Sequence, residues 1–286
     1  MRSVLPLATV ILAILAIWYV AAFTMNAKWT LDQARRAEQE VAFTALVADT
    51  LSQDRPRLPA PHQVAAELYQ TTIGKPVTSN RSLVFHGWVT FSSTVVGFAI
   101  GTLLGILLAV GIVHNRAMDL SVMPWAIASQ TIPIIALAPM IIVVLNSIGI
   151  TGLIPKAFIS AYLAFFPVVV GMATGLRSPD RIQMDLMRTY NASRAQVFWK
   201  LRVPASLPFL FTSLKVGVAA SLVGAIVGEL PTGAVAGFGA RLLAGSYYGQ
   251  TVQIWSALIG AAILAAILVG GIGLIQRITL RRMGLA

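Results

Sequence analysis

The sequence has no cysteine among its 286 residues, which excludes disulfide bonds, thiolate metal sites and cysteine nucleophiles. The three histidines, His62, His86 and His114, are too far apart to form a metal-ligand motif, so we expect no metal site. Charged residues are also scarce. Asp, Glu, Lys and Arg make up 11% of the chain, against about a quarter of a typical soluble domain. Most of the chain must therefore face something other than water.

The abundant feature is apolar sequence, with 57% hydrophobic residues and a mean hydropathy of +0.80. The formal net charge of +11 comes from basic residues gathered in a few segments between apolar runs. Membrane topology explains that distribution better than nucleic-acid binding does, and we expect no nucleic-acid partner.

Long runs without charged residues predict an all-α, polytopic membrane protein with about six transmembrane helices. The first run, Val4–Phe23, has about the 20 residues that a crossing needs, whereas the apolar region of a signal peptide, the alternative, has about 7–15. We therefore interpret residues 1–24 as an uncleaved first transmembrane helix. The later crossings are expected at 87–113, 120–147, 157–176, 204–228 and 254–276.

Residues 25–86 form a polar and nearly neutral segment between the first two crossings. Thr30–Thr50 is predicted to form one amphipathic helix and Gln63–Thr72 a second, because three prolines interrupt the helix between them (Pro56, Pro59 and Pro61). We expect 25–86 to be an external segment with short amphipathic helices and 87–286 to be a five-helix core.

The basic residues indicate the orientation of the crossings. Lys and Arg are in excess between Arg177 and Arg202 and at the C-terminal end, and Arg116 lies in another short loop. If 177–203 is cytoplasmic, alternation of six crossings makes all these basic segments and both termini cytoplasmic. Residues 25–86 then fall outside.

One crossing carries two prolines in mid-span, Pro133 and Pro139. Each removes a backbone donor, and such breaks are tolerated where neighbouring helices or a water-lined cavity satisfy the backbone. The segment either lines a translocation pathway or has a kink needed for packing. In the first interpretation Gln130, Thr131 and Asn146 form its polar wall, and Pro133 also belongs to the pathway.

Two ionisable residues and a glycine pattern stand out in the other crossings. Glu229 borders the span 204–228, and an acidic group there is expected either to act in gating or packing or to contact substrate directly. Lys215 is interpreted as an anchor whose stem extends to the cytoplasmic interface. Gly97, Gly101 and Gly105 share one helix face and predict close approach of another helix.

The segment 177–208 is too long and too regular for a simple loop. Leu186, Tyr190, Val197 and Leu201 form a helical stripe, and Asn191 suits a left-handed turn between two short helices. The segment is either an amphipathic interfacial helix or a docking helix for a cytoplasmic partner.

This segment resembles the cytoplasmic loop of ABC importer permeases, whose pattern is Glu-Ala-Ala, three residues, Gly, and Pro near the next span. Asp185 falls at the Glu, Leu186 and Met187 at the two Ala, and Asn191 at the Gly. The tract from Asp185 to Tyr190 is similar to the branch linked to pyrimidine-type thiamine precursors and riboflavin. By this resemblance, residues 183–199 form the coupling helix that enters an ATPase. Its coupling residues are Asp185, Leu186, Met187, Arg188, Tyr190, Asn191, Ala192 and Arg194.

The resemblance extends over about residues 58–282 and points to the nitrate/sulfonate/taurine-type permeases. It rests on the order and spacing of Leu58-Pro-Ala-Pro61, Ile132 to Pro139, Phe165-Phe-Pro167, Gly175-Leu-Arg177 and Val227-Gly-Glu229. The 25–57 insert has no counterpart in this pattern.

The family resemblance implies a type I ABC importer permease fold in a bacterial inner membrane. It implies two copies of a cytoplasmic ATP-binding subunit, a second permease chain, the same or related, and a periplasmic or lipid-anchored solute-binding protein, besides membrane lipid. ATP and Mg²⁺ would bind the partner ATPase, because this chain has no phosphate-binding loop and no cofactor site of its own. We therefore expect a non-catalytic subunit that moves a small organic solute by alternating access. The alternatives are a secondary transporter or channel, and a structural membrane scaffold.

Overall fold

The computed structural model describes residues 4–38, 42–231 and 236–284, and in these residues it is helical without β-strands. The chain divides into two compact units. The first comprises Met1–His86 with Ala240–Ala261, and the second comprises Gly87–Gly239 with Ala262–Ala286.

The first unit begins with a helix much longer than one crossing, α1 (Val4–Arg36). Its 33 residues span about 50 Å. The prediction of a helix over Thr30–Thr50 is wrong, because α1 continues to Arg36 and a separate helix, α2 (Phe43–Ser52), follows. No Pro or Gly lies between Phe23 and Arg36, so nothing in the backbone stops the helix where the sequence turns polar. Glu38 ends it with a left-handed φ of 53°.

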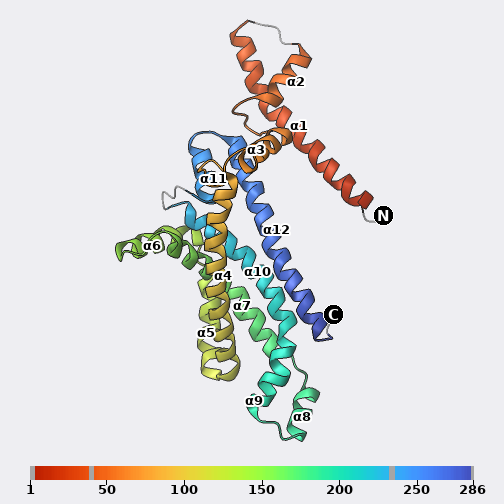
Figure 1. Ribbon diagram of the computed structural model, residues 1–286, viewed down its shortest axis with the longest axis vertical. Coiled ribbons are helices and arrows are strands. Elements are labelled where there is room, and N and C mark those ends of the chain that lie inside the picture. Colours follow the sequence, from red (N-terminus) through yellow and green to blue (C-terminus); the bar gives the residue numbers. More distant parts are fainter. Residues whose placement is uncertain (1–3, 39–41, 232–235, 285–286) are drawn as a thin grey trace. The chain divides into compact units, whose positions relative to one another are not determined.

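The insert of residues 25–57 forms a helical hairpin, in which α1 and α2 lie side by side (Figure 1). Asn26 is buried in it and bonds the next segment, donating to the carbonyl of Leu58 at 2.8 Å and accepting from the N–H of Arg57 at 2.8 Å. Thr30 donates to Asp49 at 2.8 Å across the hairpin. The insert is therefore an ordered element that fixes the entry to α3.

The remaining helices of this unit are short. Helix α3 (Pro61–Thr72) agrees with the predicted helix at Gln63–Thr72, and Pro61 is its first residue, where proline needs no N–H partner. Helix α11 (Phe238–Tyr247) and the first part of α12 (Thr251–Arg282) complete the unit. The ring centroids of Trp18 and Trp255 lie 5.0 Å apart, so α1 and α12 are in contact at these two side chains.

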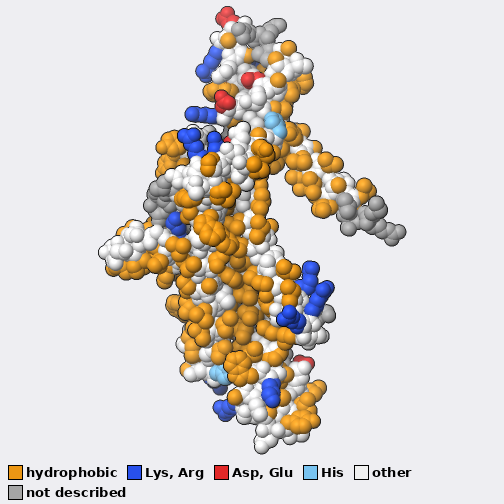
Figure 2. Space-filling view, in the orientation of Figure 1, with side chains coloured by type: hydrophobic (Ala, Val, Ile, Leu, Met, Phe, Trp, Pro, Cys, Tyr) orange, Lys and Arg blue, Asp and Glu red, His pale blue; other side chains and the backbone are white. Residues whose placement is uncertain are grey.

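The second unit is built on three long helices, α4 (Leu83–His114), α7 (Leu153–Leu176) and α10 (Val203–Glu229), which run side by side (Figure 1). The predicted close approach at the glycine stripe is present. A Cβ atom added to Gly97, Gly101 or Gly105 would lie 2.3–2.8 Å from atoms of α7. Figure 2 shows hydrophobic side chains over the middle of this unit.

The crossing expected at 120–147 is broken into two helices, α5 (Arg116–Ser129) and α6 (Ile134–Ser147), which are bent by 99°. The interruption expected at the prolines is therefore present, as a sharp bend. The break falls at Pro133, which cannot continue the helix, whereas Pro139 lies inside α6. The carbonyl of Ser129, freed at the break, accepts from the Tyr162 hydroxyl of α7.

Among the described residues, five single helices are long and apolar enough to cross a bilayer. They are α1, α4, α7, α12 and the continuous stretch Arg194–Glu229 that contains α10. The bent pair α5 and α6 brings the number to six if it makes one crossing. The predicted all-α, polytopic fold is confirmed.

Candidate functional site

A helical projection joins the ends of α7 and α10. It consists of α8 (Arg181–Thr189), α9 (Arg194–Val197) and the π-helical turn η1 (Phe198–Arg202), seen beyond the ends of the long helices in Figure 1. Asn191 has a φ of 51°, so the left-handed turn predicted between two short helices is present. Ser193 caps α9 by accepting from the N–H of Gln196 at 3.3 Å, and the Gln196 side chain accepts from the N–H of Ser193 at 2.8 Å.

This arrangement brings the predicted coupling residues together. Asp185, Leu186, Met187 and Arg188 lie on α8, and Tyr190, Asn191, Ala192 and Arg194 form the turn and the start of α9. Tyr190 is 77% exposed, and Leu186 and Ile182 are exposed as well. Apolar side chains that face solvent on a regular helix are typical of a surface that another protein covers.

Two exposed ion pairs lie at the same end of the second unit. Arg177, after the end of α7, pairs with Asp119 of α5 at 2.9 Å. On α8, Arg188 pairs with Asp185 at 2.9 Å. Both pairs are exposed, so each stabilises the fold only slightly.

The residues predicted for a translocation pathway are not gathered in one place. Gln130 and Thr131 precede the break between α5 and α6, and Pro133 caps α6. Asn146 is exposed near the other end of α6. A pathway role for these side chains stays a prediction.

Glu229 lies in a buried polar network at the end of α10. Its side chain is 0% exposed, and its two carboxylate oxygens accept from the Thr90 hydroxyl at 2.9 and 3.0 Å. The N–H of Gly239 donates to Oε2 at 2.8 Å, and the N–H of Phe238 donates to the Thr90 oxygen at 2.9 Å. The network therefore joins α4, α10 and the start of α11. Of the roles expected for Glu229, its burial favours packing or gating over substrate contact.

Lys156 belongs to the same region and was not singled out from the sequence. It lies in the first turn of α7, is 9% exposed, and its Cα lies 3.3 Å from a Cβ atom added to Gly228, the residue before Glu229. A lysine at the edge of an apolar run is normally interpreted as an interfacial anchor. Only its burial next to an acidic partner distinguishes it, and the sequence carries no signal of that proximity.

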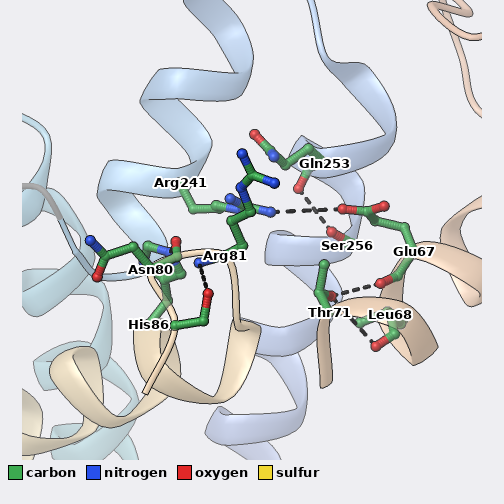
Figure 3. Close-up of polar contacts among 10 residues, drawn as sticks. Glu67, Leu68, Thr71, Asn80, Arg81, His86, Arg241, Gln253 and Ser256 are labelled. Atoms are coloured by element: carbon green, nitrogen blue, oxygen red, sulfur yellow. Dashed lines mark hydrogen bonds and ion pairs between the residues drawn. The ribbon is translucent and has the colours of Figure 1, made fainter. Parts of the chain in front are cut away.

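A second polar cluster, in the first unit, centres on Arg241 of α11 (Figure 3). Its Nη2 lies 3.7 Å from the Glu67 carboxylate of α3. With the Gln253 amide oxygen turned toward the guanidinium, that oxygen accepts from both Nη atoms at 2.9 and 3.2 Å. Burial lowers the pKa of Arg241, Glu67 opposes that shift, and neighbouring Arg81 adds to it. This arginine ties α3 of the external segment to α11 and α12.

Comparison with known proteins identifies a relationship over most of the chain. The family model described as "binding-protein-dependent transport system inner membrane component" matches residues 101–284. The formylaminopyrimidine transport permease protein ThiX of Halalkalibacterium halodurans is 34% identical over 173 residues, which are 60% of this chain and 64% of that protein. The riboflavin transport system permease protein RibX of Chloroflexus aurantiacus is 30% identical over 78% of this chain and 80% of its own length.

A solved structure shows the same fold. A chain of the MetNI methionine ABC transporter, in an inward-facing conformation, superimposes with a TM-score of 0.55 at 21% sequence identity. The superposition covers 68% of this chain and 94% of that one.

Proposed function

Since this chain belongs to the family of binding-protein-dependent transport system inner membrane components, we propose that it is the membrane-spanning permease subunit of an ATP-driven importer. It lies in a bacterial inner membrane, with both termini in the cytoplasm and the segment 25–86 outside. The concentration of basic residues around α8, α9 and the C-terminal end supports this orientation.

The observation that carries the proposal is the projection formed by α8 and α9. It connects two crossings, exposes Leu186 and Tyr190, and is held rigid by the Asn191 turn and the Ser193 cap. A rigid element of this kind transmits force between a cytoplasmic ATPase and the helices α7 and α10 to which it is joined. Two ATP-binding subunits, which hold ATP and Mg²⁺, dock there, one on each of two permease chains.

The second permease chain, the same or related, covers apolar surface that this chain leaves open. Helix α6 exposes Ile135, Met140, Val143 and Val144, and the 99° bend carries it away from the line of α5. A binding protein delivers the solute to the external face. The names of ThiX and RibX support a small nitrogen heterocycle of the pyrimidine or flavin class as the solute.

Replacing Tyr190 by Ala tests the coupling assignment. A side chain that is 77% exposed here but buried in an ATPase groove should weaken ATPase binding by about 10-fold or more, as central aromatic contacts do. Tyr247→Ala is the matched control, because Tyr247 is 80% exposed on α11, in the first unit. The affinity of the purified ATPase subunit for the permease in nanodiscs is measured. Equal affinities for the two variants would refute docking at α8 and α9.

A further inference from the structure

A basic cavity lies under the projection, between the end of α4 and the helices α8, α9 and η1. Its volume is about 360 Å³, and its walls include Arg188, Arg194 and Arg202 together with His114. All of these residues belong to the second unit. No acidic side chain lines the cavity among the described residues.

Among the described residues, the charge in this cavity is only partly neutralised. Of its three arginines, Arg188 has an ion-pair partner among the described residues, the exposed Asp185 at 2.9 Å. In the part of the chain that the structure describes, no carboxylate lies within ion-pair distance of Arg194 or Arg202. Three guanidinium groups around one cavity repel one another unless an anion lies between them. The guanidinium group binds phosphate oxygens in a two-pronged geometry.

The cavity also has an apolar side, at the level where the crossings end. The uncharged run of α4 ends at Val113 and His114, both of which line the cavity. Phe198 forms another wall, and its ring centroid lies 5.0 Å from that of His114. The next residue, Trp199, is 67% exposed, as is typical of aromatic side chains at a membrane interface. A ligand that fits these walls has a phosphate group joined to an apolar body.

We propose that this cavity binds the phosphodiester headgroup of an anionic phospholipid of the cytoplasmic leaflet, such as phosphatidylglycerol. Arg194 and Arg202 hold the phosphate, Arg188 contributes at the rim, and Val113 and Phe198 contact the glycerol and the start of the acyl chains. Basic cavities between helix ends on the cytoplasmic side are suited to such headgroups. The bound lipid then contacts both α4 and the projection formed by α8, α9 and η1. Its binding therefore stabilises the position of the projection. The inference rests on the proposed orientation.

Native mass spectrometry of the complete complex, stripped of lipid in detergent and titrated with phosphatidylglycerol, tests the proposal. Arg202→Gln and Arg194→Gln are each expected to weaken binding of one phosphatidylglycerol by about 10-fold or more, because each removes a charge-assisted hydrogen bond. Arg202→Lys, which keeps the charge, should restore part of the affinity. Lys200→Gln removes the same charge from η1 outside the cavity and should leave binding unchanged. Phosphatidylcholine should bind at least about 10-fold more weakly, because its headgroup has no net negative charge.

Three results would overturn the proposal. The first is an equal loss of phosphatidylglycerol in the Lys200→Gln control. The second is binding of glycerol 3-phosphate as tight as that of the lipid, which would identify a soluble anion as the ligand. The third is weaker ATPase binding in Arg202→Gln with unchanged lipid binding, which would identify an acidic ATPase side chain as the occupant. ATPase retention is recorded in the same spectra, so failure of the lipid site is separable from failure of the coupling assignment.

Discussion

The contact between α4 and α7 at Gly97 leaves no room for a side chain. A Cβ atom added there would lie 2.3 Å from Ser160 Cβ and 2.5 Å from the carbonyl oxygen of Ala157. Carbon atoms in contact prefer about 3.5–4.0 Å. The obstructing atoms belong to the backbone and first side-chain carbon of a helix, so they cannot rotate away. Gly97→Ala therefore forces the two helices apart by about 1 Å.

Such overpacking costs about 1–3 kcal/mol. In a helix interior, alanine is also more stable than glycine by about 1 kcal/mol. This gain in stability must be subtracted before the packing cost of Gly97→Ala can be obtained. Gly271→Ala on α12 provides the control, because no atom lies within 4 Å of a Cβ added there. The difference between the two variants isolates the packing cost. It corresponds to a change of about 5- to 150-fold in the folding equilibrium.

Thermal unfolding of the full-length chain in detergent, followed by circular dichroism, measures the difference. We expect a lower midpoint for Gly97→Ala than for Gly271→Ala, and a further decrease for Gly97→Val. Equal midpoints for the two alanine variants would mean that α4 and α7 do not make the close contact from which the cost is calculated.

Two further predictions concern the polar network and the coupling turn. Thr90→Val should cost about 1–3 kcal/mol in unfolding free energy, because the Phe238 N–H and the buried Glu229 carboxylate both lose a partner, whereas Thr90→Ser keeps the hydroxyl and most of the stability. Indistinguishable unfolding midpoints for the two variants would show that the hydroxyl is not needed. Asn191→Val should cost about 1–2 kcal/mol at φ 51° and reduce substrate-stimulated ATP hydrolysis in the reconstituted complex, whereas Asn191→Gly should retain it. Full activity in the valine variant would argue against a required left-handed turn.

The sequence was most informative where composition and spacing act locally. Uncharged runs predicted the long helices, because a bilayer excludes charge and requires backbone hydrogen bonds within the segment. The glycine spacing on α4 predicted a close contact, and the character of Asn191 predicted the turn, because both depend on the residue's own geometry. Family motifs around residues 185–208 led to the family that the comparisons identified.

The errors came from helix boundaries. The first helix continues to Arg36 although its apolar part ends near Phe23, because helix continuation depends on backbone propensity and not on hydrophobicity. The crossing at 120–147 was expected to be interrupted at its two prolines, with no choice between them, and the structure breaks it by 99° next to Pro133 and not at Pro139. Which of two prolines breaks a helix depends on what the neighbouring helix offers, here the Tyr162 hydroxyl at Ser129.

By itself, the sequence determined that this is a helical membrane protein of the importer-permease family, since hydropathy and motif order are properties of the chain alone. Only the tertiary structure decided which groups meet. It brought Thr90 of α4, Glu229 of α10 and the N–H of Gly239 within hydrogen-bond distance, and it placed Arg188, Arg194 and Arg202 around one cavity with His114. Thr90 and His114 are far along the chain from the other members of their clusters, and their proximity to them depends on how the long helices pack.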